Sequence, residues 1–362
     1  MCKCLTIEVR GDYISELLSN QDKNIVDYEE KWFFHLIGFF APILVITSNI
    51  IGGWWTASGA ILTLGIYPIL DSLLGEDKPV RNIPKSGTPY EVMLHIHSLI
   101  HPIVIITLCW RVMLDGNVWT SWAAGLSSGV ITGVCSIIVA HELGHKKPRT
   151  ISWWMGRANL VMSLYAHFTT EHNFNHHKNV STRLDPASAP KGRGLWYHVL
   201  QTIPNQFISA WSTEKRRALK KGKKLLFYKN PVFIGLLIQG LLLGIIWYIF
   251  GIWALIVFSG QAFFAIFLLE YVNYIRHYGL HREVGERQTM MHSWQSEKRL
   301  SRWTLLELTR HPAHHLKASE PFWKLRPFEG APNLPTGYFG LFWPCMIPPL
   351  WRKLMDHRIP ET

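Results

Sequence analysis

The 362-residue sequence contains few cysteines, and none of them are arranged as a metal-binding pair. The five are Cys2, Cys4, Cys109, Cys135 and Cys345, and no two of them form a Cys-x-x-Cys motif. This argues against an iron–sulfur, rubredoxin-type or zinc-ribbon site within the chain, because such sites need closely spaced thiolates. Any electrons that the protein uses must therefore come from outside it.

Charged residues are also scarce, and acidic ones are in the minority. They make up 17% of the chain, with 25 Asp and Glu against 37 Lys and Arg, for a formal net charge of +12. No nucleic-acid-binding motif accompanies this charge, so we expect no nucleic-acid partner. The basic run KRRALKKGKK at 215–224 is typical of a segment beside lipid headgroups, with the docking of an acidic partner as the alternative.

Long apolar runs, in contrast, are abundant. Six of them approach the roughly 20 residues that a helix needs to cross a bilayer, so they predict six transmembrane helices. These runs are 32–55, 56–75, 92–113, 118–140, 231–250 and 252–275. The polar, partly acidic residues 1–31 do not resemble a cleaved signal peptide, and we expect this segment to be retained.

The basic residues predict the orientation of these helices. All Lys and Arg except Arg111 lie in residues 1–31, 76–91, 141–230 and 276–362, which share one side of the membrane if six helices cross it. The positive-inside rule makes that side cytoplasmic. We therefore expect an all-α protein of the inner membrane. Helices in 32–140 and 231–275 form its bundle, and helices and loops from 141–230 and 276–362 form one cytoplasmic cap.

Nine of the 18 histidines fall in four short stretches. These are HELGH (141–145), HNFNHH (172–177), RHYG (276–279) and HPAHH (311–315). On a helix, residues three or four apart leave the same face, which pairs His141 with His145, His172 with His176, and His311 with His314. Isolated histidines are usually hydrogen-bonded or surface residues, and we expect the other nine to lie in the core, at interfaces or behind the ligands. The clustered ones are candidate ligands: His141, His145, His172, His176, His177, His277, His311, His314 and His315.

Nine imidazoles exceed what one metal ion needs, since a zinc site takes three or four protein ligands. They suit two ions of coordination number four to five, and the doublets 176/177 and 314/315 could each serve both ions. Neutral imidazole suits iron, zinc, copper or nickel better than calcium or magnesium; of these we favour iron, although spacing alone does not decide. His141 and His277 directly follow predicted membrane helices. The metals should therefore lie at the cytoplasmic mouth of an apolar space that a hydrocarbon could enter from the lipid.

Several carboxylates are candidates for orienting these imidazoles. Asp71 and Glu270 fall within or at the end of predicted membrane helices, where an ionisable group is costly and often functional. With Glu142, Glu171 and Asp185 they could accept hydrogen bonds from imidazole N–H groups. The alternative role for each is helix capping.

HELGH also matches other metal motifs. It fits His-Glu-x-x-His, in which two histidines bind zinc and Glu142 would be the general base of a protease. That reading leaves HNFNHH and HPAHH without a role. Glu142 and His145 also fit the Glu-x-x-His motif of carboxylate-bridged di-iron bundles, but the sequence has no second copy of it.

Four segments resemble the histidine boxes and HYG motif of bacterial integral-membrane alkane 1-monooxygenases. They are HELGHKK (141–147), EHNFNHH (171–177), NYIRHYGL (273–280) and LTRHPAHH (308–315). YPILD (67–71), LDPAS (184–188), HSWQS (292–296) and LPTGY (334–338) extend the resemblance over nearly the whole chain. Membrane fatty-acid desaturases and hydroxylases share looser histidine boxes, and the HYG element favours the alkane branch.

The resemblance implies a non-haem di-iron enzyme that uses O2 to hydroxylate the terminal methyl group of medium- or long-chain n-alkanes. Rubredoxin and its NADH-dependent reductase would supply electrons, and the nine histidines would hold the two iron ions. It also implies that Thr63, five residues before the proline of YPILD, borders the alkane pocket, where a small side chain admits longer chains. Arg276 departs from the family, which commonly has Glu before HYG. A desaturase or lipid hydroxylase remains the alternative enzyme class.

Overall fold

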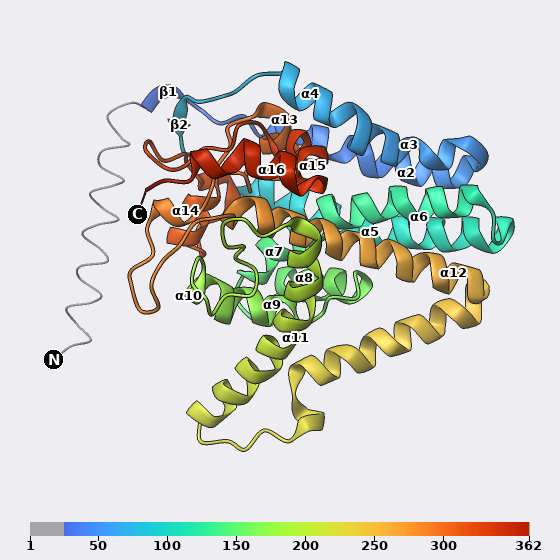
Figure 1. The fold of residues 1–362 in the computed structure, drawn as a ribbon. Coiled ribbons are helices and arrows are strands. Elements are labelled where there is room, and N and C mark those ends of the chain that lie inside the picture. Colours follow the sequence, from blue (N-terminus) through green and yellow to red (C-terminus); the bar gives the residue numbers. More distant parts are fainter. Residues whose placement is uncertain (1–24, 362) are drawn as a thin grey trace.

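The computed structural model describes residues 25–361, and nearly every regular element in this range is a helix (Figure 1). Cys2, Cys4 and the rest of residues 1–24 lie outside the described residues. Within the described range Cys109, Cys135 and Cys345 are buried and free of disulfides. Buried cysteines of this kind pack as small apolar side chains.

Five helices within residues 25–361 are long and apolar enough to cross a membrane, and we treat them as membrane helices. They span Trp32–Ile51, Gly53–Leu73, Thr88–Asp115, Trp119–Gly144 and Pro231–His277. Large apolar side chains are exposed along them, including Leu241 at 65% and Trp247 at 60%. Extended apolar surface of this kind suits contact with lipid rather than water.

Two of these helices contain π-helical segments. The helix over Gly53–Leu73 joins α3 (Ser58–Ala60) to α4 (Tyr67–Leu73) through a π segment at Ile61–Ile66. The helix over Trp119–Gly144 joins α6 (Trp119–Ile131) to α7 (Ile138–Gly144) through a π segment at Thr132–Ile137. The first membrane helix consists of a 3-10 segment at Trp32–Phe39 followed by α2 (Phe40–Ile51). The third is the continuous, 28-residue α5 (Thr88–Asp115).

The longest helix, α12 (Pro231–His277), has 47 residues and is not straight. A straight helix of that length would extend about 70 Å, more than twice the hydrocarbon core of a bilayer. Gly251 interrupts it with φ 84° and ψ 177°, a conformation that glycine adopts without steric cost. Figure 1 shows the two arms folding back on each other, with the bend at the same end as the α2–α3 and α5–α6 turns. The arms correspond to the predicted helices 231–250 and 252–275.

The polar parts of the chain form a layer at the opposite end of the helices, around α8, α14 and α16 in Figure 1. Its first segment contains α8 (Ile151–Met162), α9 (Phe168–Glu171), a π segment at His172–His176, α10 (His177–Asn179), α11 (Leu195–Lys220) and a 3-10 turn at Phe227–Lys229. Its second contains 3-10 turns at Met290–His292, Phe322–Lys324 and Asp356–Arg358, with α13 (Arg299–Thr304), α14 (His311–Leu316), α15 (Tyr338–Met346) and α16 (Pro348–Met355).

Backbone hydrogen bonds join these two segments. Gly279 N donates to Ala189 O at 2.8 Å, and Arg282 N donates to Ser181 O at 2.8 Å. Such bonds need the two backbones in contact, so residues far apart in sequence build one continuous layer.

A small parallel sheet departs from the all-α expectation. Strand β1 (Ile25–Glu29) pairs with β2 (Val80–Asn82) beside the polar layer (Figure 1). The strands are too short to stand out in the sequence, since three to five residues carry little alternation. A buried arginine lies below them: Arg302 pairs with four carboxylates, those of Glu30, Asp77, Glu297 and Glu307.

Candidate metal centre

The nine clustered histidines converge at the boundary between the membrane helices and the polar layer. Within residues 25–361 they form two groups, and in each group the candidate ligand atoms lie within 4.8 Å of one another. We call the larger set the five-histidine group, and it contains His141, His145, His172, His177 and His314. The four-histidine group contains His176, His277, His311 and His315.

The HNFNHH stretch divides between the groups in a way that its spacing did not predict. The expected pair was His172 with His176, four residues apart on an α-helix. Residues His172–His176 instead form a π segment, in which positions five apart come together. The Nε2 atoms of His172 and His177 are accordingly 2.9 Å apart, and His176 faces the other group. The predicted pairing was therefore wrong, although all three residues are present at the site.

The HPAHH stretch also divides differently from the prediction, which paired His311 with His314. In α14 the Nε2 atoms of His311 and His315 are 2.9 Å apart, as expected for an i,i+4 pair. His314 instead places its Nε2 3.1 Å from that of His177. Each of the doublets 176/177 and 314/315 thus contributes one histidine to each group, as their adjacency suggested.

The donor atoms suit metal ions better than they suit one another. His177 Nε2 approaches the Nε2 atoms of both His172 and His314, and His311 Nε2 approaches those of both His277 and His315, at 2.9 to 3.2 Å. A single ring nitrogen cannot satisfy two others by sharing one proton. Nitrogens bound about 2.0–2.1 Å from one ion lie about 2.9–3.4 Å from each other, which matches this spacing.

Further ring nitrogens are buried without a hydrogen-bond partner. Among the described residues, both nitrogens of His141 and the Nε2 atoms of His145 and His176 lack one. A buried polar atom without a partner costs free energy, so an uncompensated cluster of this kind points to a bound group. Imidazole donors without thiolates suit iron, zinc, copper or nickel. The nine residues therefore fit two transition-metal ions.

Burial favours the neutral form of six of these imidazoles at pH 7. It lowers the pKa of His145 to about 4, and holds the pKa of His172, His177 and His314 well below the usual range. The same cause lowers the pKa of His311 and His315. Metal ligation requires the neutral form, so the site needs little deprotonation before an ion binds.

Asp185 is the predicted carboxylate that contacts a site histidine. Its Oδ2 lies 2.9 Å from His176 Nδ1. Burial would raise the pKa of Asp185, but the nearby His176 and the Ser188 hydroxyl lower it below the usual value. An acceptor on Nδ1 leaves His176 Nε2 free to face the four-histidine group. His277 is held similarly, with its Nδ1 3.2 Å from the His292 carbonyl oxygen.

The other predicted carboxylates bond elsewhere within residues 25–361. Glu142 accepts from Phe322 N at 3.3 Å, because adjacent residues on a helix do not face the same way and it points away from the site. Glu270 accepts from Gln206 Nε2 at 2.8 Å, and Asp71 from the Ser301 hydroxyl at 2.8 Å. Glu171 accepts from Asn175 at 2.6 Å. In contrast to the prediction, none of these bonds orients a site imidazole: three join separate segments of the chain, and the bond of Glu171 lies within its own helical stretch.

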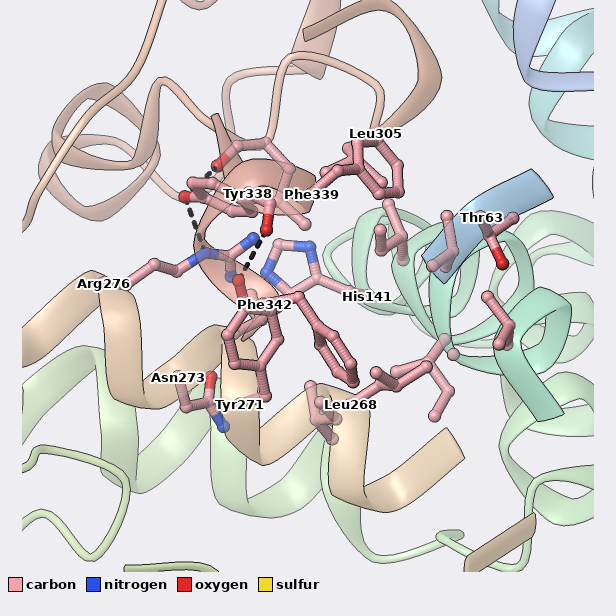
Figure 2. A pocket seen from close by; sticks show the side chains of 18 of the residues that line it. Thr63, His141, Leu268, Tyr271, Asn273, Arg276, Leu305, Tyr338, Phe339 and Phe342 are labelled. Carbon is pink, nitrogen blue, oxygen red and sulfur yellow. Dashed lines mark hydrogen bonds between the residues drawn. The ribbon is translucent and has the colours of Figure 1, made fainter. Parts of the chain in front are cut away.

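An apolar pocket runs between the membrane helices to the five-histidine group. His141 and His172 of this group are among its lining residues. Thr63 lines a wall away from His141 (Figure 2). Between them the lining is mainly aliphatic and aromatic, with Val130, Leu268 and Phe342 among its residues. Thr63 is buried and donates to Gly59 O at 2.7 Å. The predicted pocket residue thus lies on the pocket wall, in the π segment of the second membrane helix.

A second cavity is polar and opens on the outer face of the polar layer. It lies between α11 and the loop after α10, and Asp185 forms part of its wall. We call it the basic groove, because six basic residues line it: Lys178, Arg183, Arg193, Arg216, Arg217 and Lys220. Asp185 contacts His176 of the four-histidine group, so one residue separates the groove from the site. Basic side chains here were visible in the sequence, but their grouping was not.

Comparison with known proteins gives related enzymes over most of the chain. A model of the fatty acid desaturase family matches residues 117–352. An alkane 1-monooxygenase of Alcanivorax borkumensis is 34% identical over 91% of this chain and 84% of its own length. One from Pseudomonas aeruginosa is 36% identical over 84% of this chain and 83% of its own. The hydroxylase component of a Pseudomonas putida xylene/toluene monooxygenase is 26% identical over 84% of this chain.

Proposed function

The chain belongs to the fatty acid desaturase family and, within it, to the alkane 1-monooxygenases, and we propose on this basis that it hydroxylates the terminal methyl group of medium- and long-chain n-alkanes. The reaction consumes one alkane, one O2, two electrons and two protons, and yields a 1-alkanol and water. The observation that carries the proposal is the apolar pocket, which leads from the membrane helices to His141 and His172.

We propose that the nine histidines hold two iron ions, one in each group. Bound there, iron would supply the activation of O2 that insertion into a C–H bond requires. The neutral imidazoles and their spacing support this assignment, as does the family. Asp185 would fix the orientation of His176 in the four-histidine group.

The pocket residues would bind and orient the hydrocarbon. An alkane offers no polar group, so its affinity must come from apolar burial against side chains such as Val130, Leu268 and Phe342. A chain that fills the pocket also excludes water from the histidines. Thr63 would border the space available to the chain, and its small side chain would admit longer alkanes.

We further propose six membrane crossings, with the histidine groups on the cytoplasmic side of the inner membrane. The bend at Gly251 supports a separate crossing by each arm of α12, since each arm is long enough to span a bilayer. The polar layer carries most of the basic residues, as the positive-inside rule expects of a cytoplasmic face.

The electron donor in this proposal is rubredoxin, reduced by its NADH-dependent reductase. The chain has no Cys-x-x-Cys pair of its own with which to carry electrons. An acidic partner would find opposite charge in the basic groove, and Asp185 there leads to His176. The groove supports docking of the donor next to the four-histidine group.

The alternative functions make different products. A desaturase or lipid hydroxylase would act on an acyl chain, and a zinc protease would cleave peptides with Glu142 as its base. The bond from Phe322 N to Glu142 argues against the last, and so does the contribution of all four histidine stretches, not HELGH alone, to the two groups.

The test is metal analysis of the purified, detergent-solubilised chain, followed by an n-octane assay with rubredoxin, reductase and NADH. We expect about two iron atoms per chain and formation of 1-octanol. One zinc and no iron would overturn the proposal. Iron-loaded protein that does not hydroxylate octane but oxidises acyl chains would favour the desaturase or lipid hydroxylase.

A further inference from the structure

One polar side chain in the apolar pocket lacks the partners that its charge calls for. Arg276 is 3% exposed and lines the pocket near His141 (Figure 2). Its Nε donates to Tyr338 Oη at 3.0 Å. Its Nη2 is buried and has no hydrogen-bond partner within residues 25–361. The guanidinium therefore presents an unused donor in a region of low polarity.

Two other buried arginines of the chain have partners for their guanidinium groups. Arg302 pairs with four carboxylates, those of Glu30, Asp77, Glu297 and Glu307. Arg282 donates to the backbone carbonyl oxygens of Lys178, Val180 and Glu286 at 2.6 to 3.1 Å. Arg276 has no carboxylate among the ion pairs of the described residues. A buried cation without a counter-charge is costly, so this arrangement favours any ligand that brings an oxygen atom.

The position of Arg276 determines which end of a bound hydrocarbon lies next to its guanidinium group. Arg276 and Thr63 lie on opposite sides of the pocket in Figure 2, with His141 beside the guanidinium. Arg276 also directly precedes His277 of the four-histidine group in the chain. The carbon that is hydroxylated must reach the histidines. The oxygen that it gains is therefore delivered next to Arg276.

We propose that Nη2 of Arg276 binds the hydroxyl oxygen of the 1-alkanol, which makes the inner end of the pocket selective for the oxygenated chain over the alkane. This rests on the proposed hydroxylation. The alkane has no lone pair to offer the guanidinium, whereas the alcohol accepts a charge-assisted hydrogen bond. The product is thus held more tightly than the substrate, and its release is slowed.

The strength of this hydrogen bond determines how much more tightly the alcohol should bind than the alkane. A hydrogen bond to a charged group contributes enough to change a binding constant by about 10- to 100-fold. An n-alkanoate of the same length is a sharper probe, because its carboxylate can pair with the guanidinium in both charge and geometry. It should enter with its carboxylate inward and compete with the alkane.

The experiment compares wild type with Arg276→Gln and Arg276→Lys in the iron-loaded enzyme. For each protein we would measure the inhibition constant of 1-dodecanol and the KM of n-dodecane, and take their ratio. Partition into detergent affects every variant alike and cancels in the comparison. We expect the ratio to rise about 10- to 100-fold in Arg276→Gln and to be partly restored in Arg276→Lys. Inhibition by dodecanoate should disappear in Arg276→Gln.

Arg282→Gln is the matched control, because it removes a buried guanidinium whose donors are already used by backbone carbonyl oxygens. Its ratio should stay at the wild-type value. If Arg276→Gln fails to hold iron, the same question is answered by thermal unfolding of the metal-free proteins. There 1-dodecanol should raise the Tm of wild type more than n-dodecane does, and this difference should vanish in the variant.

An unchanged ratio in folded, iron-loaded Arg276→Gln would overturn the proposal. So would equal effects of 1-dodecanol and n-dodecane on the wild-type Tm. Failure of the wild type to hydroxylate dodecane would instead overturn the proposed function, so the two failures are distinguishable.

Discussion

The two histidine groups lie side by side but face different surroundings. The five-histidine group meets the apolar pocket through His141 and His172. The four-histidine group meets the basic groove through His176 and Asp185. One group therefore faces a space suited to hydrocarbon, and the other faces a surface suited to a charged partner. Two groups with similar histidine ligands can therefore have different roles because their surroundings differ.

Adjacent residues connect the groups. The ring centroids of His176 and His177 are 6.0 Å apart, and those of His314 and His315 are 5.8 Å apart, with one member of each pair in each group. Electrons that enter at the four-histidine group would have only this short distance to cover. The division also means that damage to one group should be separable from damage to the other.

The largest effect should come from removing a ligand on either side. We expect His172→Ala to abolish alkane hydroxylation and lower the iron content from about two to about one per chain, because a ligand of one ion is lost. His315→Ala should do the same through the other group. Elemental analysis and an n-octane assay check both, and circular dichroism should show that the membrane helices remain folded. Turnover that survives His172→Ala would remove this residue from the ligand set.

The next largest effect should distinguish the role of the basic groove from that of the apolar pocket. Reversal of three charges in the groove, Lys178→Glu, Arg183→Glu and Arg216→Glu together, should slow rubredoxin-supported turnover about 10-fold or more, because charge complementarity governs encounter rates. Reduction by dithionite should be unaffected. Stopped-flow measurement of the rubredoxin step at low and high salt provides the readout.

The matched control for the groove is an equal charge reversal at another polar surface pocket, at Lys85, Lys317 and Lys324. These residues lie away from Asp185, in or beside a pocket lined by Glu142 and His145. Their reversal should change rubredoxin-supported turnover much less. If both triple variants slow the reaction equally, the groove is not the docking surface.

A smaller effect should follow from Asp185→Asn, which weakens the acceptor for His176 Nδ1. Loss of such a partner typically lowers metal affinity 10- to 100-fold, here in the four-histidine group alone. Chelator titration would show one iron leaving sooner than in wild type, while the alkane chain-length profile stays the same. Glu142→Gln, whose carboxylate contacts Phe322 N, is the comparison. Equal iron loss in both variants would argue against a special role for Asp185.

The smallest effect on overall rate should come from Thr63→Trp, on the pocket side. The larger side chain would fill part of the pocket wall, so activity should shift toward shorter alkanes while octane turnover changes only a few-fold. Gas chromatography of the products from a mixture of n-alkanes measures the shift. Thr63→Ser, which is close in size, should keep the wild-type profile. An unchanged profile in Thr63→Trp would show that this wall does not limit chain length.

Much of the site was predictable because its signals are local. Imidazoles repeat at short spacings, and apolar runs have the length of a membrane crossing, so the nine histidines and the membrane helices could be identified from the sequence. The bend in α12 was also predictable as a boundary between two runs. The short strands and the hydrogen-bond partners of Glu142 and Glu270 were not, because those depend on which distant residues pack against them.

The sequence by itself determined which side chains gather at the metal centre, since the donor type and the apolar periodicity are properties of the residues. Tertiary structure decided how they divide. The π segment at His172–His176 turned His177 rather than His176 toward His172, and packing brought His314 next to His177 across 137 residues. It also left Nη2 of Arg276 buried in the pocket without a hydrogen-bond partner among residues 25–361. Helix register and long-range packing depend on contacts between distant parts of the chain, so they cannot be predicted from any single stretch of the sequence.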